Sequence, residues 1–132
     1  MSEYMTPEVQ AQARAAGDML QRICHDLAVD CGWYHNPHTG EPIQRNDGEQ
    51  MMLIVSEVSE AMEAHRKGLM DDKLPHRSGV EVEMADAVIR IADFCGKHGF
   101  DLGGAIAEKL TFNANRPDHK PENRVKAGGK AY

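Results

Sequence analysis

Hydrophobic residues recur at steps of three and four along most of this chain, which is the spacing of a helix that packs along one face. The first such stretch should begin near Thr6, a suitable N-cap, with Pro7 at the first helical position. It should end near residues 30–42, "DCGWYHNPHTGEP", because glycines and prolines there favour a loop. Its apolar positions are Ala13, Ala16, Leu20, Ile23 and Leu27.

Three further helices follow the same spacing. They are expected over about Asp47–Lys67, ended by Gly68; about Val80–Lys97, before Gly99; and from Asp101, a cap, to a point before Pro117. No stretch alternates strictly with period two, so no strand is predicted. The pattern therefore predicts an all-α, four-helix bundle with an irregular basic C-terminal tail.

Composition places the chain among ordinary globular proteins. Its 132 residues are 41% hydrophobic and 27% charged, which suits a single domain over residues 1–132. No apolar run approaches the length of a membrane span, and the polar N-terminus does not resemble a secretory signal. Three cysteines, Cys24, Cys31 and Cys95, form no CxxC pair and are expected to be free thiols in a reducing cytoplasm.

The charge is uneven along the chain. Residues 116–132 hold five Lys or Arg and two acids, a net +3, whereas the whole chain carries −6. The overall acidity argues against a general nucleic-acid binder, but the basic tail leaves room for a small anionic ligand. A solvated, flexible C-terminus is the alternative explanation of the tail.

Two pairs of acids lie next to apolar stripes. Glu57 and Glu60 fall in "IVSEVSEAMEAHRKG", and Glu83 and Asp86 fall in "EVEMADAVIRIAD". Residues three apart point to one side of a helix, so four carboxylates would converge if the two stripes packed together. Such a cluster requires cations, and oxygen ligands without His or Cys favour Mg²⁺, with Mn²⁺ as a substitute. Alternatively, each pair is solvated surface charge. Two acids outside the pairing, Glu63 and Glu81, are expected either to support the metal ligands from behind or to be solvated.

This arrangement resembles the MazG-like all-α nucleoside triphosphate pyrophosphohydrolases. The ExxE motif is followed after 22 residues by ExxD, and the similarity runs from about Asp47 to His119, through "EKLTFNANRPDHK". The resemblance implies a helical bundle that forms a homodimer or homotetramer. It also implies Mg²⁺-dependent hydrolysis of a nucleoside triphosphate to the monophosphate and pyrophosphate. The four paired acids would take the family's metal-ligand positions.

The expected mechanism is attack of water on phosphorus, with one carboxylate accepting the proton. The expected general base, which accepts the proton of the attacking water, is Glu57 or Glu60, and the sequence does not distinguish them. Some phage-type relatives of the family act on (d)GTP, so a purine, guanine first, is the expected base of the substrate. A phage-encoded enzyme of this kind would work in the host cytoplasm.

The fourth helix carries candidate phosphate ligands. Lys109, Asn113 and Arg116 are spaced i, i+4 and i+7, hence on one face, and they match the family's K-N-R pattern. Two cations and an amide suit a polyphosphate, and His119 and Lys120 could extend the site. Alternatively, the cations only stabilise the C-terminal end of the helix dipole.

The loop before the second helix is the candidate site for the nucleobase. Trp33 could stack on a base and Asn36 could bond to its edge, while Met51 and Ile54 would line the other side. An equally supported alternative is that Trp33 or Tyr34 caps the core of the bundle.

Three other functions fit parts of the pattern. A di-iron bundle would need Glu-x-x-His pairs, and none occurs in the sequence. A phosphoribosyl-ATP pyrophosphohydrolase would share the fold and the chemistry. A non-catalytic helical interaction module would keep the bundle but would not require the acids in phase with the cations of the fourth helix. The sequence has no P-loop motif and no Ser/His/Asp arrangement for covalent catalysis.

Overall fold

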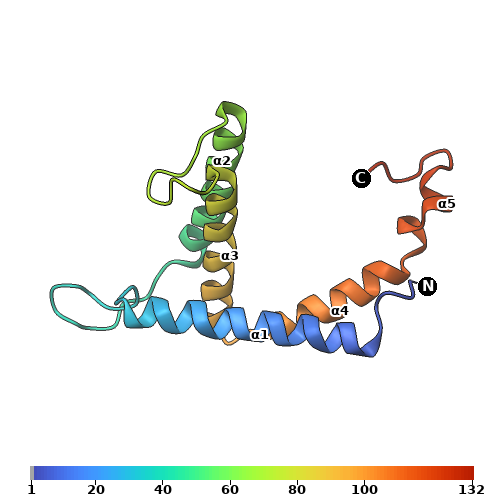
Figure 1. The fold of residues 1–132 in the computed structure, drawn as a ribbon. Helices are drawn as coiled ribbons and strands as arrows, with labels where there is room; N and C mark the ends of the chain where they lie inside the picture. Colours follow the sequence, from blue (N-terminus) through green and yellow to red (C-terminus); the bar gives the residue numbers. More distant parts are fainter. Residues whose placement is uncertain (1) are drawn as a thin grey trace. The chain divides into compact units, whose positions relative to one another are not determined.

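The computed structural model describes residues 2–132, which form helices and no strand. This confirms the all-α prediction. No helix in the described part of the chain is both long and apolar enough to cross a bilayer. The elements are α1 (Pro7–Asp30), α2 (Asp47–Lys67), α3 (Gly79–His98), α4 (Leu102–Asn115), the 3₁₀ turn η1 (Pro117–His119) and the single-turn helix α5 (Pro121–Arg124) (Figure 1).

The four long helices begin at side-chain caps. In each case an oxygen of the capping side chain accepts the backbone N–H three residues later, which satisfies a donor that the helix leaves unpaired. At α3 the contact is reciprocal, because the Glu81 carboxylate also accepts the backbone N–H of Ser78. The capping residues are Thr6, Asn46, Ser78 and Asp101.

Glycines end α2 and α3. Gly68 and Gly99 have φ values of 63° and 65°, in the left-handed region that glycine adopts without steric cost. Beyond α4 the tail is more regular than expected, because it forms the helical turns η1 and α5. Each turn begins with a proline, Pro117 in η1 and Pro121 in α5. Proline at the first position of a helical turn is the local signal that could have predicted both turns.

The chain divides into two compact units. One consists of residues 20–100, and the other consists of the described residues up to Met19 together with residues 101–132. Helix α1 contributes its first turns to the second unit and its last turns to the first.

Within residues 20–100, α2 and α3 lie side by side as an antiparallel hairpin (Figure 1). At one end the Lys97 ammonium donates to Asp47 Oδ1 and Gln50 Oε1, at 2.7 and 2.6 Å. At the other end the backbones of Met70 and Ser78 pair in a β-bridge. Small side chains form the seam and allow the helices to approach closely: Ala61, Ala64 and Ala87 are buried.

The larger apolar residues of α2 are not where the sequence pattern predicts them. The apolar stripe of its sequence consists of Ile54, Val55, Val58, Ala61 and Met62. Ala61 is buried, but the exposed fractions of Val55, Val58 and Met62 are 51%, 46% and 66%. Glu57 is only 7% exposed, because it lies on the alanine side of the helix that packs against α3. The hairpin therefore buries a row of small residues and one acid, and leaves its bulky apolar side chains outside.

The other unit joins the start of α1 to α4. A Cβ placed on Gly17 would lie 2.6 Å from Gly103 Cα, and one on Gly103 would collide with the Arg14 carbonyl and the Asp18 side chain. The two glycines therefore permit the close crossing of these helices. The Arg14 guanidinium also pairs with Asp101 at 3.3 Å on the exposed side.

Candidate metal centre and adjoining cavity

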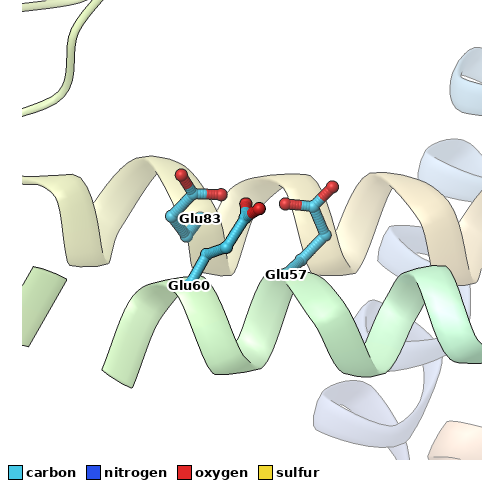
Figure 2. Close-up of side chains that lie close together, drawn as sticks. All are labelled: Glu57, Glu60 and Glu83. Atoms are coloured by element: carbon cyan, nitrogen blue, oxygen red, sulfur yellow. The ribbon is translucent and has the colours of Figure 1, made fainter. Parts of the chain in front are cut away.

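Three carboxylates converge across the seam of the hairpin. Glu57 and Glu60 project from α2 and Glu83 projects from α3 toward them (Figure 2). One oxygen from each residue lies within 4.8 Å of the other two. The i, i+3 spacing places the two α2 acids on one side of the helix, and the antiparallel pairing brings the α3 acid opposite. Glu57 is buried, Glu83 is partly buried and Glu60 is exposed.

The pKa values of this cluster depart from their ordinary range. Burial, together with the nearby Glu57 and Glu60 carboxylates, raises the pKa of Glu83 from 4.5 to about 7. Burial opposes the ionisation of Glu57, but the Arg90 guanidinium and hydrogen bonds with the neighbouring acids outweigh it, so the pKa of Glu57 is lowered. Neutral and ionised carboxyls therefore share the cluster when no cation is bound.

The donor set fits a hard divalent cation. Three carboxylate oxygens without nitrogen or sulfur ligands match Mg²⁺ or Mn²⁺, and a cation would remove the repulsion that raises the Glu83 pKa. The coarse prediction, an acidic cluster able to hold a metal ion, is confirmed.

Asp86, the fourth predicted ligand, is not part of this group of three. It lies one helical turn beyond Glu83 on α3 and lines a neighbouring cavity with Glu57. Burial and the negative charge of Glu57 raise the pKa of Asp86. The ExxD pair therefore spans the edge of the cluster, with one acid inside it and one beside it.

The two acids outside the pairing, expected either to support the metal ligands or to be solvated, form ion pairs on the surface. Glu63 pairs on the surface of α2 with Arg66 and Lys67, at 3.1 and 2.6 Å. Glu81 pairs with Arg77 at 3.2 Å, in addition to its capping role.

Sequence reasoning missed Arg90. Its Nε donates to Glu57 Oε1 at 2.7 Å, from α3 to α2. The available signal was its spacing, four residues after Asp86 and seven after Glu83, which places all three on one face of α3.

A cavity of about 430 Å³ adjoins the cluster within residues 20–100. Trp33 lines it and is 64% exposed in the single chain. Leu53 of α2 lines the cavity, whereas Met51, Ile54 and Asn36 are not among its lining residues. The Asn36 side chain instead accepts the backbone N–H groups of residues 38 and 39, which shapes the loop. Of the four predicted base-contacting residues, the structure places one at the cavity.

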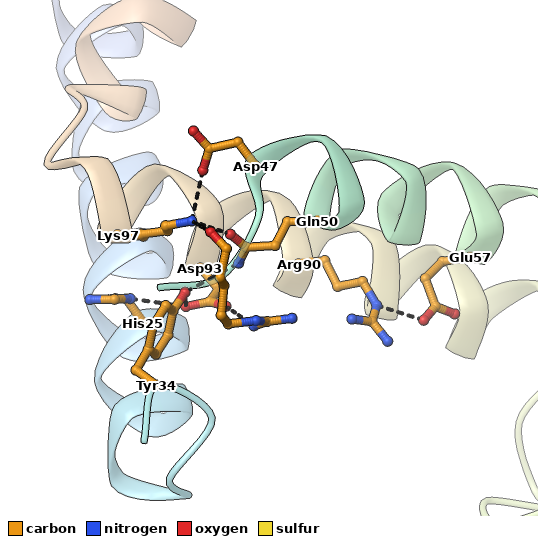
Figure 3. A network of polar contacts seen from close by, with 9 residues as sticks. His25, Tyr34, Asp47, Gln50, Glu57, Arg90, Asp93 and Lys97 are labelled. Atoms are coloured by element: carbon orange, nitrogen blue, oxygen red, sulfur yellow. Dashed lines mark hydrogen bonds and ion pairs between the residues drawn. The ribbon is translucent and has the colours of Figure 1, made fainter. Parts of the chain in front are cut away.

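A polar network fixes the loop that carries Trp33 (Figure 3). The Tyr34 hydroxyl donates to Asp93 Oδ1 at 2.9 Å, and His25 Nδ1 lies 2.9 Å from the same oxygen. The Arg45 guanidinium lies over the Tyr34 ring, 5.6 Å from its centroid, and pairs with Asp93 Oδ2 at 3.8 Å. Asp93 of α3 thus contacts residues near both ends of the loop, and His25 of α1 contacts Asp93; only the fold brings these residues together.

The predicted phosphate ligands belong to the other unit. Lys109 and Arg116 both lie over the Phe112 ring of α4, at 4.9 and 5.7 Å from its centroid, which places these two cations on one side of the helix as predicted. Arg116 also forms a bidentate ion pair with Asp118, at 3.0 and 2.6 Å. This pair lowers the pKa of Asp118, and sequence reasoning missed it.

The remaining three candidates line a cavity of about 360 Å³ at the end of α4. They are Asn113, His119 and Lys120. Asn113 Oδ1 is buried and has no hydrogen-bond partner among residues 2–132. His119 Nε2 lies 3.4 Å from the Lys130 ammonium.

Comparison with known proteins gives no relative: no protein-family model, curated protein or solved structure matches this chain. The resemblance of its motifs to the MazG-like enzymes therefore stays a prediction.

Proposed function

We propose that this protein hydrolyses a (deoxy)nucleoside triphosphate to the monophosphate and pyrophosphate with Mg²⁺, and that Mn²⁺ substitutes. The observation that carries the proposal is the convergence of Glu57, Glu60 and Glu83 within 4.8 Å. Three acids from two helices lie together, and one of these acids, Glu57, is buried. This arrangement favours a bound divalent cation over solvated surface charge. Asp86 is the proposed fourth ligand, at the side of the cluster that faces the cavity.

The cavity supports a small organic substrate. Its volume of about 430 Å³ lies within the range of roughly 300–1,000 Å³ that is usual for ligand sites. Trp33 offers an exposed aromatic face on which a base can stack, and Leu53 and Ile89 add apolar wall. A purine, guanine first, remains the proposed base.

The catalytic role proposed for the chain is positioning and proton transfer. Bound divalent cations would neutralise phosphate oxygens and lower the pKa of water. Glu57 is held by Arg90, which fixes the orientation of its carboxylate. Glu60 is the exposed acid of the cluster, so its carboxylate can accept a proton from the attacking water and release it to solvent. Glu60 is therefore preferred over Glu57 as the base.

The cations of the tail keep their proposed role as phosphate ligands. The unpartnered Asn113 oxygen marks a cavity whose polar groups include His119 and Lys120. Lys109 and Arg116 offer two further cations on one side of α4.

Assembly as a homodimer or homotetramer is part of the proposal. The outer side of α2 exposes Met52, Val55, Val58 and Met62, each to 46% or more, and a second copy of the chain would cover such a row. The free thiols Cys24, Cys31 and Cys95 suit a cytoplasmic enzyme, or the host cytoplasm for a phage-encoded one. No nucleic-acid or membrane partner is proposed.

The test is pyrophosphate release from each of the four NTPs and four dNTPs, with Mg²⁺ and with EDTA. The wild-type protein should release pyrophosphate only with the metal. Glu60→Gln should abolish release while leaving the circular dichroism of the helices unchanged. Glu63→Gln is the matched control, one turn along the same helix in a surface ion pair, and should remain active.

The same experiment separates the alternatives. Turnover of phosphoribosyl-ATP in preference to all eight nucleotides would identify the related hydrolase. Absence of turnover with every substrate would favour a non-catalytic interaction module. Full activity of Glu60→Gln would remove the basis of the proposal.

A further inference from the structure

Arg90 contacts the carboxylate that the proposed metal needs. Its Nε donates to Glu57 Oε1 at 2.7 Å (Figure 3), a short charge-assisted contact. The Glu57 side chain is only 10% exposed, whereas that of Arg90 is 39% exposed. The acid is therefore fixed by the hairpin seam, while the Arg90 side chain remains partly accessible to solvent.

A divalent cation on the cluster would compete with this contact. It would place two positive charges beside the oxygens of Glu57, within a few ångströms of a guanidinium that is always protonated. The carboxylate cannot move far because it is buried, but Arg90 can rotate along its partly exposed stem. Metal binding should therefore release Arg90 rather than displace Glu57.

Arg90 already lies at the wall of the cavity beside the cluster. It lines the cavity of about 430 Å³ together with Arg45, Trp33 and Asp86. Arg45 supplies a second guanidinium to the same wall, from the loop fixed by Asp93. Two guanidiniums beside a metal cluster suit a polyphosphate, since arginine binds phosphate oxygens in pairs.

We propose that Arg90 is an exchangeable counter-cation, which neutralises Glu57 in the metal-free protein and turns to bind the phosphates of the substrate once metal is bound. The inference rests on the proposed function, since it requires the metal site. It adds a residue that contacts substrate and that the motifs do not indicate. A purely structural ion pair would keep Arg90 on Glu57 in both states.

The two roles predict different effects of removing Arg90 on Mn²⁺ affinity. If Arg90 competes with the metal, Arg90→Ala should bind Mn²⁺ more tightly than wild type, by about tenfold, because the ion pair need not be broken first. If the pair only positions Glu57, its loss should leave Mn²⁺ affinity unchanged or weaken it. Calorimetric titration with Mn²⁺ alone, without nucleotide, measures this affinity.

The second measurement concerns the anion. With Mn²⁺ saturating, inorganic tripolyphosphate should bind Arg90→Ala about tenfold more weakly than wild type, and Arg90→Lys should recover part of the loss. Thermal unfolding should show the exchange independently. Arg90→Ala should melt below wild type in EDTA, and most of this difference should disappear with excess Mn²⁺.

Arg77→Ala is the matched control for all three measurements. Arg77 pairs with Glu81 near the start of α3, at 3.2 Å on the exposed surface, and does not line the cavity. Its removal should change neither Mn²⁺ nor tripolyphosphate affinity. A general effect of losing one positive charge would appear in both variants and would overturn the assignment to Arg90.

The outcomes distinguish this inference from the function on which it rests. Wild-type protein that binds no Mn²⁺ would overturn the proposed function, and the exchange with it. Tight Mn²⁺ binding by wild type, with Arg90→Ala weaker or equal, would overturn only the exchange. The exchange would also be overturned if Arg90→Ala bound Mn²⁺ more tightly but tripolyphosphate as well as wild type.

Discussion

Replacing Glu83 with glutamine should stabilise the metal-free protein, by an amount that grows with pH. The pKa of Glu83 is raised from 4.5 to about 7 by burial and by the Glu57 and Glu60 carboxylates. Below about pH 4.5 this carboxyl is protonated in both the folded and the unfolded chain and costs nothing. Between 4.5 and 7 the unfolded chain loses the proton first, so the wild-type free energy of unfolding falls with rising pH. Above pH 7 the loss is complete.

The magnitude follows from the same interval. From 4.5 to about 7, at about 1.4 kcal/mol per pKa unit, the ceiling is about 3.5 kcal/mol. The side chain is partly exposed, and solvent screening reduces this figure to about 1–2 kcal/mol. Glutamine carries no charge, and its amide can donate to Glu57 or Glu60, so the variant should avoid the loss.

Urea unfolding in EDTA, at about pH 5 and about pH 8, measures the effect. The free energy of unfolding of Glu83→Gln should exceed that of wild type at both pH values, with the larger difference at pH 8. Glu81→Gln is the control on the same helix. Contacts with Ser78 and Arg77 lower the pKa of Glu81, so its ionised form stabilises the fold and its replacement should not stabilise at pH 8.

A gain in the free energy of unfolding that is the same at both pH values would refute the reasoning. A variant less stable than wild type at pH 8 would refute it too, because removing one of several repelling carboxylates should not destabilise the fold. In excess Mg²⁺, wild type should be more stable than Glu83→Gln. A metal ion that binds only the folded state stabilises it by an amount that grows with the ratio of free metal to its dissociation constant, and the variant lacks one proposed metal ligand.

Three further predictions concern the base, the helix crossing and the assembly. Trp33→Ala should weaken nucleotide binding by about 1–3 kcal/mol and narrow the discrimination among bases; kinetics with four dNTPs would measure this, and an equal loss for all four would contradict base stacking. Gly103→Ala should destabilise the protein by about 1–3 kcal/mol in urea, because its methyl group would collide with Arg14 and Asp18, and an unchanged midpoint would contradict the close crossing. Sedimentation should show a species larger than the 14.6 kDa chain at micromolar concentration, whereas an active monomer would contradict the proposed assembly.

The helix ends could be predicted because neighbouring residues set them. Gly68 and Gly99 end their helices by adopting positive φ, and Asp101 caps α4 through its own side chain. Each of these interactions spans only a few residues, so the sequence contains the necessary information.

Packing between helices was less predictable. The period of α2 indicates an apolar stripe that includes Ala61, which is buried, but it does not indicate that Val58 would stay outside while Ala64 is buried. Three of the four paired acids converged as the motifs predict and Asp86 lies beside them, whereas the contact of Arg90 with Glu57 joins residues 33 positions apart and depends on the register of the hairpin. Register is a property of the folded pair, and the spacing within one helix does not determine it.

The alanine seam between α2 and α3 has a consequence for how the fold responds to dilution. Alanine buries little apolar area, so the seam contributes much less hydrophobic free energy than a core of leucines would. The hairpin therefore has little stability in reserve, and burial of the outer Val58 and Met62 by another copy would add directly to its free energy of unfolding. Folding and association would then share one equilibrium, and the thermal midpoint would rise with protein concentration. Below the concentration at which copies associate, the helix pairing that brings the acids of the cluster together would be less stable.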